Sequence, residues 1–161
     1  MAVAARIQEV RNELTEVAER SRSAPELMQS VVRLLHDRML KYNWVGFYLL
    51  EPGAEPPVLV LGAFEGAMTP HTRIPLNQGI CGAAASSGQT VVVDDVNKDP
   101  RYLACSLETK SEIVVPVFVH GEIVGELDID SHFPAAFTPE HQALVQYCAH
   151  LVGQKMEASP I

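Results

Sequence analysis

Residues 113–129 have the sequence IVVPVFVHGEIVGELDI, in which two apolar, largely β-branched runs flank the dipeptide His120-Gly121. A two-residue connection that ends in glycine between two such runs is typical of a β-hairpin. We therefore predict antiparallel strands over residues 113–119 and 122–129. Because hairpin strands pair antiparallel, the same stretch predicts an antiparallel sheet with helices packed against it.

Several shorter segments before the hairpin also have the composition of strands. Residues 44–50, with the sequence WVGFYLL, are aromatic and β-branched, as strands prefer. Pro-Gly and Pro-Pro pairs then break the chain and indicate a turn. Further strands are expected over residues 58–64, 71–74 and 90–93, and a short helix is expected from Gly79 to about Gly88.

A helix is predicted over the first 22 residues of the chain. Apolar side chains with a 4-3-4-3 spacing draw one narrow stripe along it, formed by Val3, Ile7, Val10, Leu14 and Val17. The stripe fits packing on its own domain and pairing with a second copy equally well. A homodimer through this helix is therefore one of our expectations.

Two further helices have clear start signals. Ser23-Ala24-Pro25-Glu26 has the pattern of a capping box and predicts a helix to about Lys41. Thr138-Pro139 opens the last helix in the same way. These elements predict a single α/β (α+β) domain over residues 1–161: helices over 1–41, then a core over 42–161 with an antiparallel sheet of about five to six strands and a C-terminal helix.

Composition restricts the kind of partner. The chain carries 20 acidic and 12 basic residues, a formal net charge of -8, and its lack of a basic stripe argues against nucleic acid. An anionic membrane would repel this charge, and no apolar run reaches the ~18 residues of a membrane span. The N-terminus lacks the apolar stretch of a signal peptide. We therefore expect a soluble, cytoplasmic protein that binds a cationic or zwitterionic small molecule.

The cysteines are Cys81, Cys105 and Cys148, and their odd number in such a chain argues for free thiols. Cys81 lies where a glycine-rich turn becomes a helix. Unpaired backbone N–H groups at that point would lower the thiol pKa; the alternative is a small residue at a crowded turn. Cys148 lies on the apolar face of the last helix and is predicted to be core.

Cys105 lies in the long, aperiodic segment 94–111, between Arg101 and Lys110. Long ordered loops in compact domains are often functional, and nearby cations favour the thiolate. Cys105 is therefore a candidate reactive thiol, with an unreactive loop cysteine as the alternative.

Three acidic residues lie at the ends of the predicted hairpin. Asp128 and Asp130 are two apart on one strand and so point to the same face, and Glu112, at the start of the neighbouring strand, should lie near Asp130. Two close carboxylates raise one of their pKa values, which suits a proton donor. They could equally hold a substrate ammonium group, and a solvated strand end is the alternative.

Trp44 and Tyr48 also share a face of their strand, where they could wall a small pocket or pack in the core. The six histidines are scattered, without a His-x-x-x-His or Cys-x-x-Cys pair, so we expect no structural metal site.

Several short segments together resemble the free methionine-R-sulfoxide reductases, which are stand-alone GAF-domain enzymes. The resemblance extends from about Tyr42 to the C-terminus. It is carried by Asn43–Tyr48, Arg73–Pro75, Gly79–Gly82, Asp95-Val96, Ala104-Cys105, Ser111–Val114 and Leu127–Ser131.

The resemblance implies an oxidoreductase that reduces free L-methionine-(R)-S-oxide, with no bound cofactor and with thioredoxin and NADPH as the external reductant. In that family, the cysteine in the position of Cys105 is the nucleophile. The implied substrate-binding residues are Trp44, Tyr48, Glu112, Asp128 and Asp130.

One position departs from the family pattern. The resolving cysteine usually lies ten residues before the cysteine that corresponds to Cys81, and here that position is His71. Cys81 could resolve instead, if Cys105 comes within disulfide reach, or an external thiol could do so. The remaining alternative is a non-catalytic GAF domain that binds a small molecule or senses redox state.

Overall fold

The computed structural model describes residues 2–102 and 107–158 of the chain. The four α-helices and six strands follow one another along the described chain in the order expected from the sequence. The helices are α1 (Ala2–Arg20), α2 (Ala24–Arg38), α3 (Gly79–Ser87) and α4 (Pro139–Ala158), with a short 3-10 helix, η1 (Val96–Lys98). The strands are β1 (Trp44–Leu50), β2 (Val58–Glu65), β3 (Arg73–Pro75), β4 (Val91–Val93), β5 (Ser111–Val119) and β6 (Glu122–Ser131).

The six strands form one sheet in the order β3-β2-β1-β6-β5-β4, and every neighbouring pair is antiparallel. The predicted hairpin β5–β6 lies near its centre and pairs from Ser111↔Ser131 to Val119↔Glu122. Its two connecting residues have φ angles of 50° (His120) and 79° (Gly121). Positive φ at both positions matches the right-handed twist of the strands, so the hairpin prediction is confirmed.

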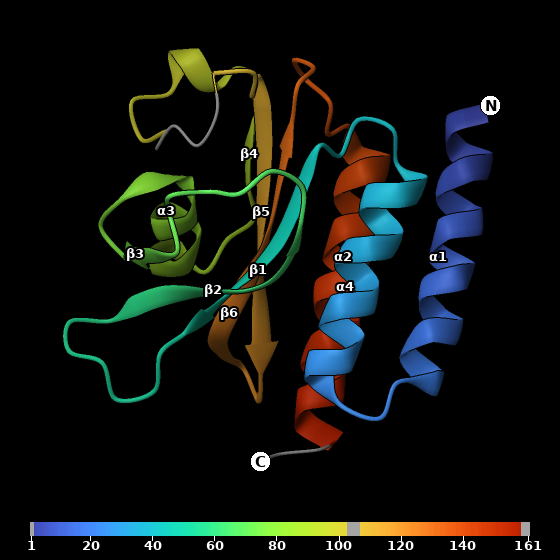
Figure 1. Ribbon diagram of the computed structural model, residues 1–161, viewed down its shortest axis with the longest axis horizontal. Helices are drawn as coiled ribbons and strands as arrows, with labels where there is room; N and C mark the ends of the chain where they lie inside the picture. Colours follow the sequence, from blue (N-terminus) through green and yellow to red (C-terminus); the bar gives the residue numbers. More distant parts are fainter. Residues whose placement is uncertain (1, 103–106, 159–161) are drawn as a thin grey trace.

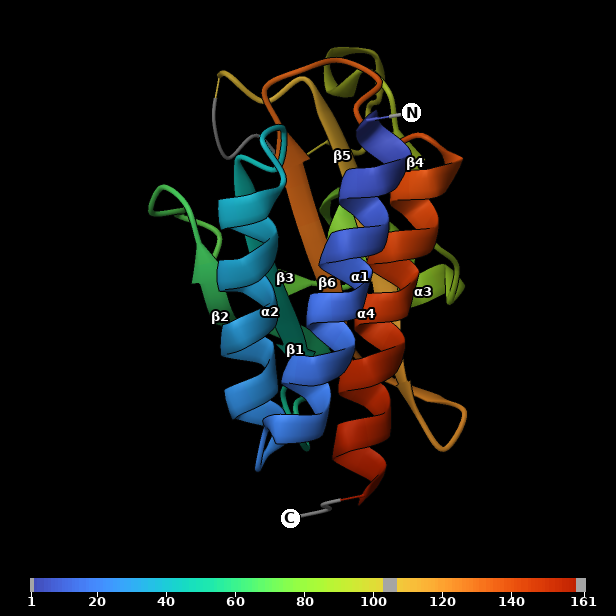
Figure 2. The same cartoon turned by 90° about the vertical axis from the view of Figure 1, so that its right-hand side faces the viewer.

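Three helices cover one face of the sheet and α3 lies on the other (Figure 1). In Figure 2, α1 lies across α2 and α4 as an outer layer. The main apolar core fills the space between the sheet and these helices; it includes Val31, Phe47, Leu127, Leu144 and Cys148. Cys148 is a core residue, as predicted, and its pKa is raised by burial to about 12.

The apolar stripe of α1 packs on its own domain. Val10 and Leu14 are fully buried within the chain, whereas Val3 is 58% exposed. Of the two uses that the spacing allowed, intramolecular packing accounts for the centre of the stripe. The homodimer stays a prediction.

The start of α2 has half of the predicted capping box. The Ser23 hydroxyl accepts a hydrogen bond from the Glu26 backbone N–H (3.3 Å), which satisfies an N–H group that a helix start leaves unpaired. The Glu26 carboxylate accepts a hydrogen bond from the N–H of Arg22 (2.9 Å), one residue before the Ser23 cap, rather than from Ser23 itself. None of the helices in the described part of the chain combines the length and apolar character that crossing a membrane requires.

A second, smaller core lies on the α3 face of the sheet. It contains Tyr48, Ile74, Ile80, Cys81 and Val114. The short helix η1 was not predicted from the sequence. Asp95 caps its first residue, Val96, and the Asp95 carboxylate accepts a hydrogen bond from the Asn97 N–H (3.1 Å). The α3 face is where the candidate functional residues meet.

Candidate active site

The three predicted carboxyl groups lie together at one end of the hairpin. Glu112 pairs with Asp130 across β5 and β6, and Asp128 lies two residues before Asp130 on the same face. All three are buried, with exposed fractions of 3 to 5%. The expected pairing is confirmed, but the solvated strand end is not: these groups are withdrawn from water.

Burial and mutual repulsion act on the protonation of these groups. Burial is the largest cause and raises the pKa of Glu112, Asp128 and Asp130, and Asp128 raises the pKa of the other two further. Oδ1 of Asp128 and Oδ1 of Asp130 have no hydrogen-bond partner in the described part of the chain. A buried carboxylate whose oxygen has no hydrogen-bond partner is stabilised by taking up a proton or by contact with a cation.

Sequence reasoning missed a fourth acid, Glu126. It precedes Asp128 by two residues on β6, lies opposite Tyr48 of β1, and is fully buried. Neither of its carboxylate oxygens has a hydrogen-bond partner among the described residues, and burial raises its pKa well above the usual range. Extending the period-two pattern backwards by one step would have found it. We call Glu112, Glu126, Asp128 and Asp130 the acid cluster.

Cys81 lies in the first turn of α3, directly over the acid cluster. Its thiol donates a hydrogen bond to Oδ2 of Asp128, with 3.3 Å between sulfur and oxygen. Burial, followed by the carboxylates of Asp128, Glu126 and Glu112, raises the pKa of Cys81 well above its usual value. The expectation of a lowered pKa was therefore wrong. The dipole of a nine-residue helix does not offset desolvation together with several nearby negative groups.

Trp44 is held in place on three sides. Its indole stacks on the Phe64 ring with centroids 5.8 Å apart, and Nε1 donates a hydrogen bond to the Ala67 carbonyl (3.1 Å). The ring lies over Gly46, where an added Cβ would come within 2.3 Å of it. The absence of a side chain at Gly46 therefore makes room for the indole.

Tyr48 stands beside Trp44, as their shared face predicts, with ring centroids 6.2 Å apart. Its hydroxyl donates a hydrogen bond to the backbone carbonyl of His71 (2.7 Å). This bond ties the segment before β3 to β1. His71 therefore lies beside the candidate site. It occupies the position at which the family pattern described above has its resolving cysteine.

The residues described above line two cavities. The larger has a volume of about 270 Å³, and its lining includes Trp44, Thr109 and Asp130. The smaller, of about 20 Å³, is lined by residues that include Tyr48, His71, Cys81, Glu112 and Asp128. Together, the two cavities touch every sequence-predicted site residue in the described ranges.

Cys105, the predicted nucleophile, lies outside the described residues. Among the described residues, Glu108 and Thr109 line the larger cavity.

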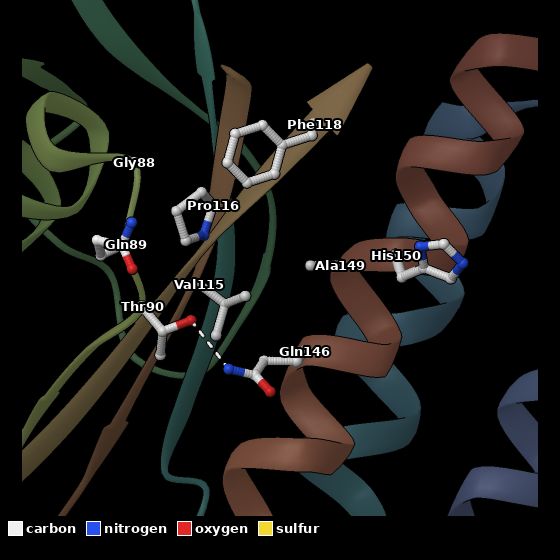
Figure 3. Close-up of a pocket in the computed structure, with 9 residues that line it drawn as sticks. All are labelled: Gly88, Gln89, Thr90, Val115, Pro116, Phe118, Gln146, Ala149 and His150. Atoms are coloured by element: carbon white, nitrogen blue, oxygen red, sulfur yellow. Dashed lines mark hydrogen bonds between the residues drawn. The ribbon is translucent and has the colours of Figure 1, made fainter. Parts of the chain in front are cut away.

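A third cavity, of about 290 Å³, lies between β5 and α4 (Figure 3). Figure 3 shows Gln146 of α4 pointing towards Thr90, to which its Nε2 donates a hydrogen bond of 3.2 Å. Among the described residues, those that line this third cavity carry no thiol or carboxyl group. The candidate chemistry is on the other side of the molecule, under α3.

The order of the strands in the sheet and the placement of the helices on its two faces are those of a GAF domain. The GAF domain family matches residues 23–156. A solved structure of a GAF domain matches with a TM-score of 0.84 and 29% identity. The match covers 94% of this chain and 87% of that one. The chain belongs to the GAF domain family.

Within that class, the similarity to one group of enzymes is extensive. Free methionine-R-sulfoxide reductase from Escherichia coli is 42% identical over 119 residues, which span 73% of this chain and 69% of that protein. The free methionine-R-sulfoxide reductase of Saccharomyces cerevisiae is 46% identical over 55% of this chain and 48% of its own length. The chain therefore also belongs to the free methionine-R-sulfoxide reductase family, a family of oxidoreductases.

Solved structures agree with this assignment. The free methionine-R-sulfoxide reductase from Neisseria meningitidis, solved in complex with its substrate, matches with a TM-score of 0.89 and 35% identity over 97% of this chain and 91% of that one. A type II free methionine-R-sulfoxide reductase from Thermoplasma acidophilum matches with a TM-score of 0.78 and 42% identity, covering 84% of this chain and 93% of that one.

Proposed function

We propose that this protein reduces free methionine-R-sulfoxide to methionine at the acid cluster. The observation that carries the proposal is that three buried carboxyl groups, a thiol and two aromatic rings line two cavities on this side of the sheet. The identity with free methionine-R-sulfoxide reductases over most of the chain supports it.

The acid cluster provides selectivity for a free amino acid. A free amino acid carries an ammonium group, which Glu112, Asp128 and Asp130 can neutralise; a methionine within a protein lacks it. The unpartnered oxygens of Asp128 and Asp130 are acceptors for its N–H groups. The larger cavity, next to Trp44, then receives the side chain. Its 270 Å³ is near the lower end of small-molecule pockets, which begin at roughly 300 Å³.

The reduction needs one nucleophile and one proton donor. The Cys105 thiolate attacks the sulfoxide sulfur while a protonated carboxyl group of the acid cluster gives its proton to the sulfoxide oxygen. Methionine leaves, and Cys105 keeps the oxygen as a sulfenic acid. Raised pKa values in Glu112 and Asp130 support a carboxyl group that holds a proton at neutral pH.

The second thiol completes the cycle. The Cys81 sulfur attacks the Cys105 sulfur, a disulfide forms, and the oxygen leaves as water. Asp128, which already accepts the Cys81 S–H, takes the proton from Cys81, and the departing hydroxyl of the sulfenic acid receives this proton to form the water. A buried thiol with a raised pKa is a poor first nucleophile, which supports this division of roles. A thioredoxin-type dithiol then reduces the disulfide, with NADPH as the electron source and no cofactor bound to the chain.

Counting thiols after one turnover tests this assignment. The reduced protein is mixed with free methionine-R-sulfoxide in the absence of reductant. We expect one methionine per chain and the loss of two of the three thiols, since Cys148 is fully buried in the core. The Cys81→Ser variant should still release one methionine but keep a sulfenic acid that dimedone traps.

The matched control is Cys148→Ser, which should behave as the unaltered protein. If no methionine forms and all thiols survive, the domain binds without chemistry, and the alternative raised by His71 holds. Loss of both thiols to peroxide alone, without methionine formation from the sulfoxide, would instead indicate a redox sensor.

A further inference from the structure

Three potential metal ligands from three different elements surround the smaller cavity. The sulfur of Cys81 (α3), one carboxylate oxygen of Glu112 (β5) and one of Asp128 (β6) all lie within 4.8 Å of one another, and all three residues are buried. No local sequence spacing connects them, so a search for His-x-x-x-His or Cys-x-x-Cys pairs could not detect the group.

We propose that the reduced protein binds one thiophilic divalent cation of the Zn²⁺ class at Cys81, Glu112 and Asp128. Zinc bonds to sulfur and oxygen are 2.0–2.3 Å long, so tetrahedral ligands are about 3.5 Å apart. The separation of 3.3 Å between the Cys81 sulfur and Asp128 Oδ2 already fits. The widest of the three separations has to close by about 1 Å, and water takes the fourth position.

Unsatisfied oxygen atoms next to this group provide an independent argument. Asp128 Oδ1 and both carboxylate oxygens of Glu126 are buried without a hydrogen-bond partner in the described part of the chain. No lysine, arginine or histidine of the described ranges forms an ion pair with the acid cluster. Buried negative groups are stabilised by a cation, and a dication also accepts the thiolate of Cys81.

The dimensions of the smaller cavity fit an ion. Its volume of about 20 Å³ exceeds the roughly 10–15 Å³ that one water-sized probe needs, and it is far below that of an amino acid. The larger cavity, in contrast, has the size for the substrate. The cation and the substrate side chain therefore have separate places, although the cation and the substrate ammonium share Glu112 and Asp128.

The consequence for the cycle depends on the proposed function. A Cys81 thiolate bound to a cation cannot attack the sulfenic acid of Cys105, so the cation blocks resolution. Conversely, the disulfide removes the thiolate ligand and releases the cation. The bound cation thus inhibits the reduced enzyme, and the oxidised enzyme does not bind it.

Cadmium chloride is a suitable probe, because thiolate-to-Cd²⁺ charge transfer gives an ultraviolet band. Titration of the reduced, chelator-free protein should give this band with one Cd²⁺ per chain. In Cys81→Ser, the band should vanish and the affinity should fall by more than about tenfold. Cys148→Ser and Cys105→Ser are the matched controls and should keep the band.

X-ray absorption of the unaltered Cd²⁺-loaded protein tests the same ligand set without any variant. One sulfur neighbour and the remaining neighbours oxygen support the site, whereas two sulfur neighbours, or none, refute it. The absence of a band in the unaltered protein, or a band that survives Cys81→Ser, also refutes it. Both measurements are made without substrate, so a protein that binds Cd²⁺ but reduces no sulfoxide would refute only the proposed function.

Discussion

The thiol of Cys81 donates its hydrogen bond to Oδ2 of Asp128 across 3.3 Å, and this contact joins α3 to β6 at the centre of the candidate active site. It places a protonated sulfur directly on a carboxylate that faces the smaller cavity. In the proposed cycle, Asp128 accepts this proton when Cys81 attacks Cys105, and the raised pKa of Cys81 makes it a poor first nucleophile.

Replacing Asp128 by Asn removes the charge but keeps the shape. The substrate ammonium loses a charged partner, which is worth about 1.5–3 kcal/mol, so KM for free methionine-R-sulfoxide should rise roughly 10- to 100-fold. The measurement is steady-state kinetics beside Glu51→Gln, a carboxylate that pairs with Arg73 and lines neither of the two site cavities. A KM equal to that of the control would remove Asp128 from substrate binding.

Glu126 should destabilise the fold, because it is fully buried and its carboxylate oxygens have no hydrogen-bond partner in the described residues. Glu126→Leu should therefore raise the free energy of unfolding by about 1–3 kcal/mol, measured with urea at pH 7. Glu51→Gln, in an exposed pair with Arg73, should leave the free energy of unfolding almost unchanged, because solvent screens such a pair. A clear loss of stability in Glu126→Leu would show that the neighbouring Cys81 thiol stabilises this acid by more than its burial costs.

Cys148 should make the protein less stable in alkali. Burial raises its folded-state pKa to about 12, while an unfolded thiol titrates near about 8.5. Between these values the unfolded state holds fewer protons, so the free energy of unfolding falls as pH rises, by up to about 1.4 kcal/mol per pH unit.

Urea unfolding at pH 8, 9 and 10 under reducing conditions measures this slope. In Cys148→Ala the slope should be shallower, and the remaining slope belongs to groups such as Cys81, whose pKa is also raised by burial. Equal slopes in the two proteins would contradict a raised pKa at Cys148.

Gly46→Ala should displace the Trp44 indole, since the new Cβ would lie 2.3 Å from the ring. Trp44 is the single tryptophan of the chain, so its emission spectrum reports the change directly. We expect a red shift as the ring gains solvent, together with a higher KM. Gly62→Ala is the matched control, because its Cβ would have its nearest neighbour at 3.5 Å. Identical emission in both variants would contradict the packing of Trp44 on Gly46.

The sequence predicts most of the fold because the deciding signals are local. The turn His120-Gly121 and the apolar runs on either side of it predict the β5–β6 hairpin. Antiparallel pairing then places Glu112 beside Asp130 without any knowledge of the rest of the chain. The same local logic finds the start of α2 at Ser23.

What the sequence could not predict depends on contacts between distant segments. The pKa of Cys81 is raised by carboxylates of β5 and β6, and these residues are 31 or more positions away along the chain. The stacking of Trp44 on Phe64 likewise needs the β1–β2 pairing. Glu126 is different: its period-two spacing from Asp128 was visible, but isolated acids on a strand are usually solvated.

The most direct test of the central claim is turnover with separated epimers. NADPH oxidation is followed with thioredoxin and thioredoxin reductase, on free methionine-R-sulfoxide and on its S epimer, for the unaltered protein, Cys105→Ser and Cys148→Ser. The account predicts turnover of the R epimer alone, lost in Cys105→Ser and kept in Cys148→Ser. Absence of turnover with both thioredoxin and dithiothreitol as reductants, in a protein that remains folded, would contradict it.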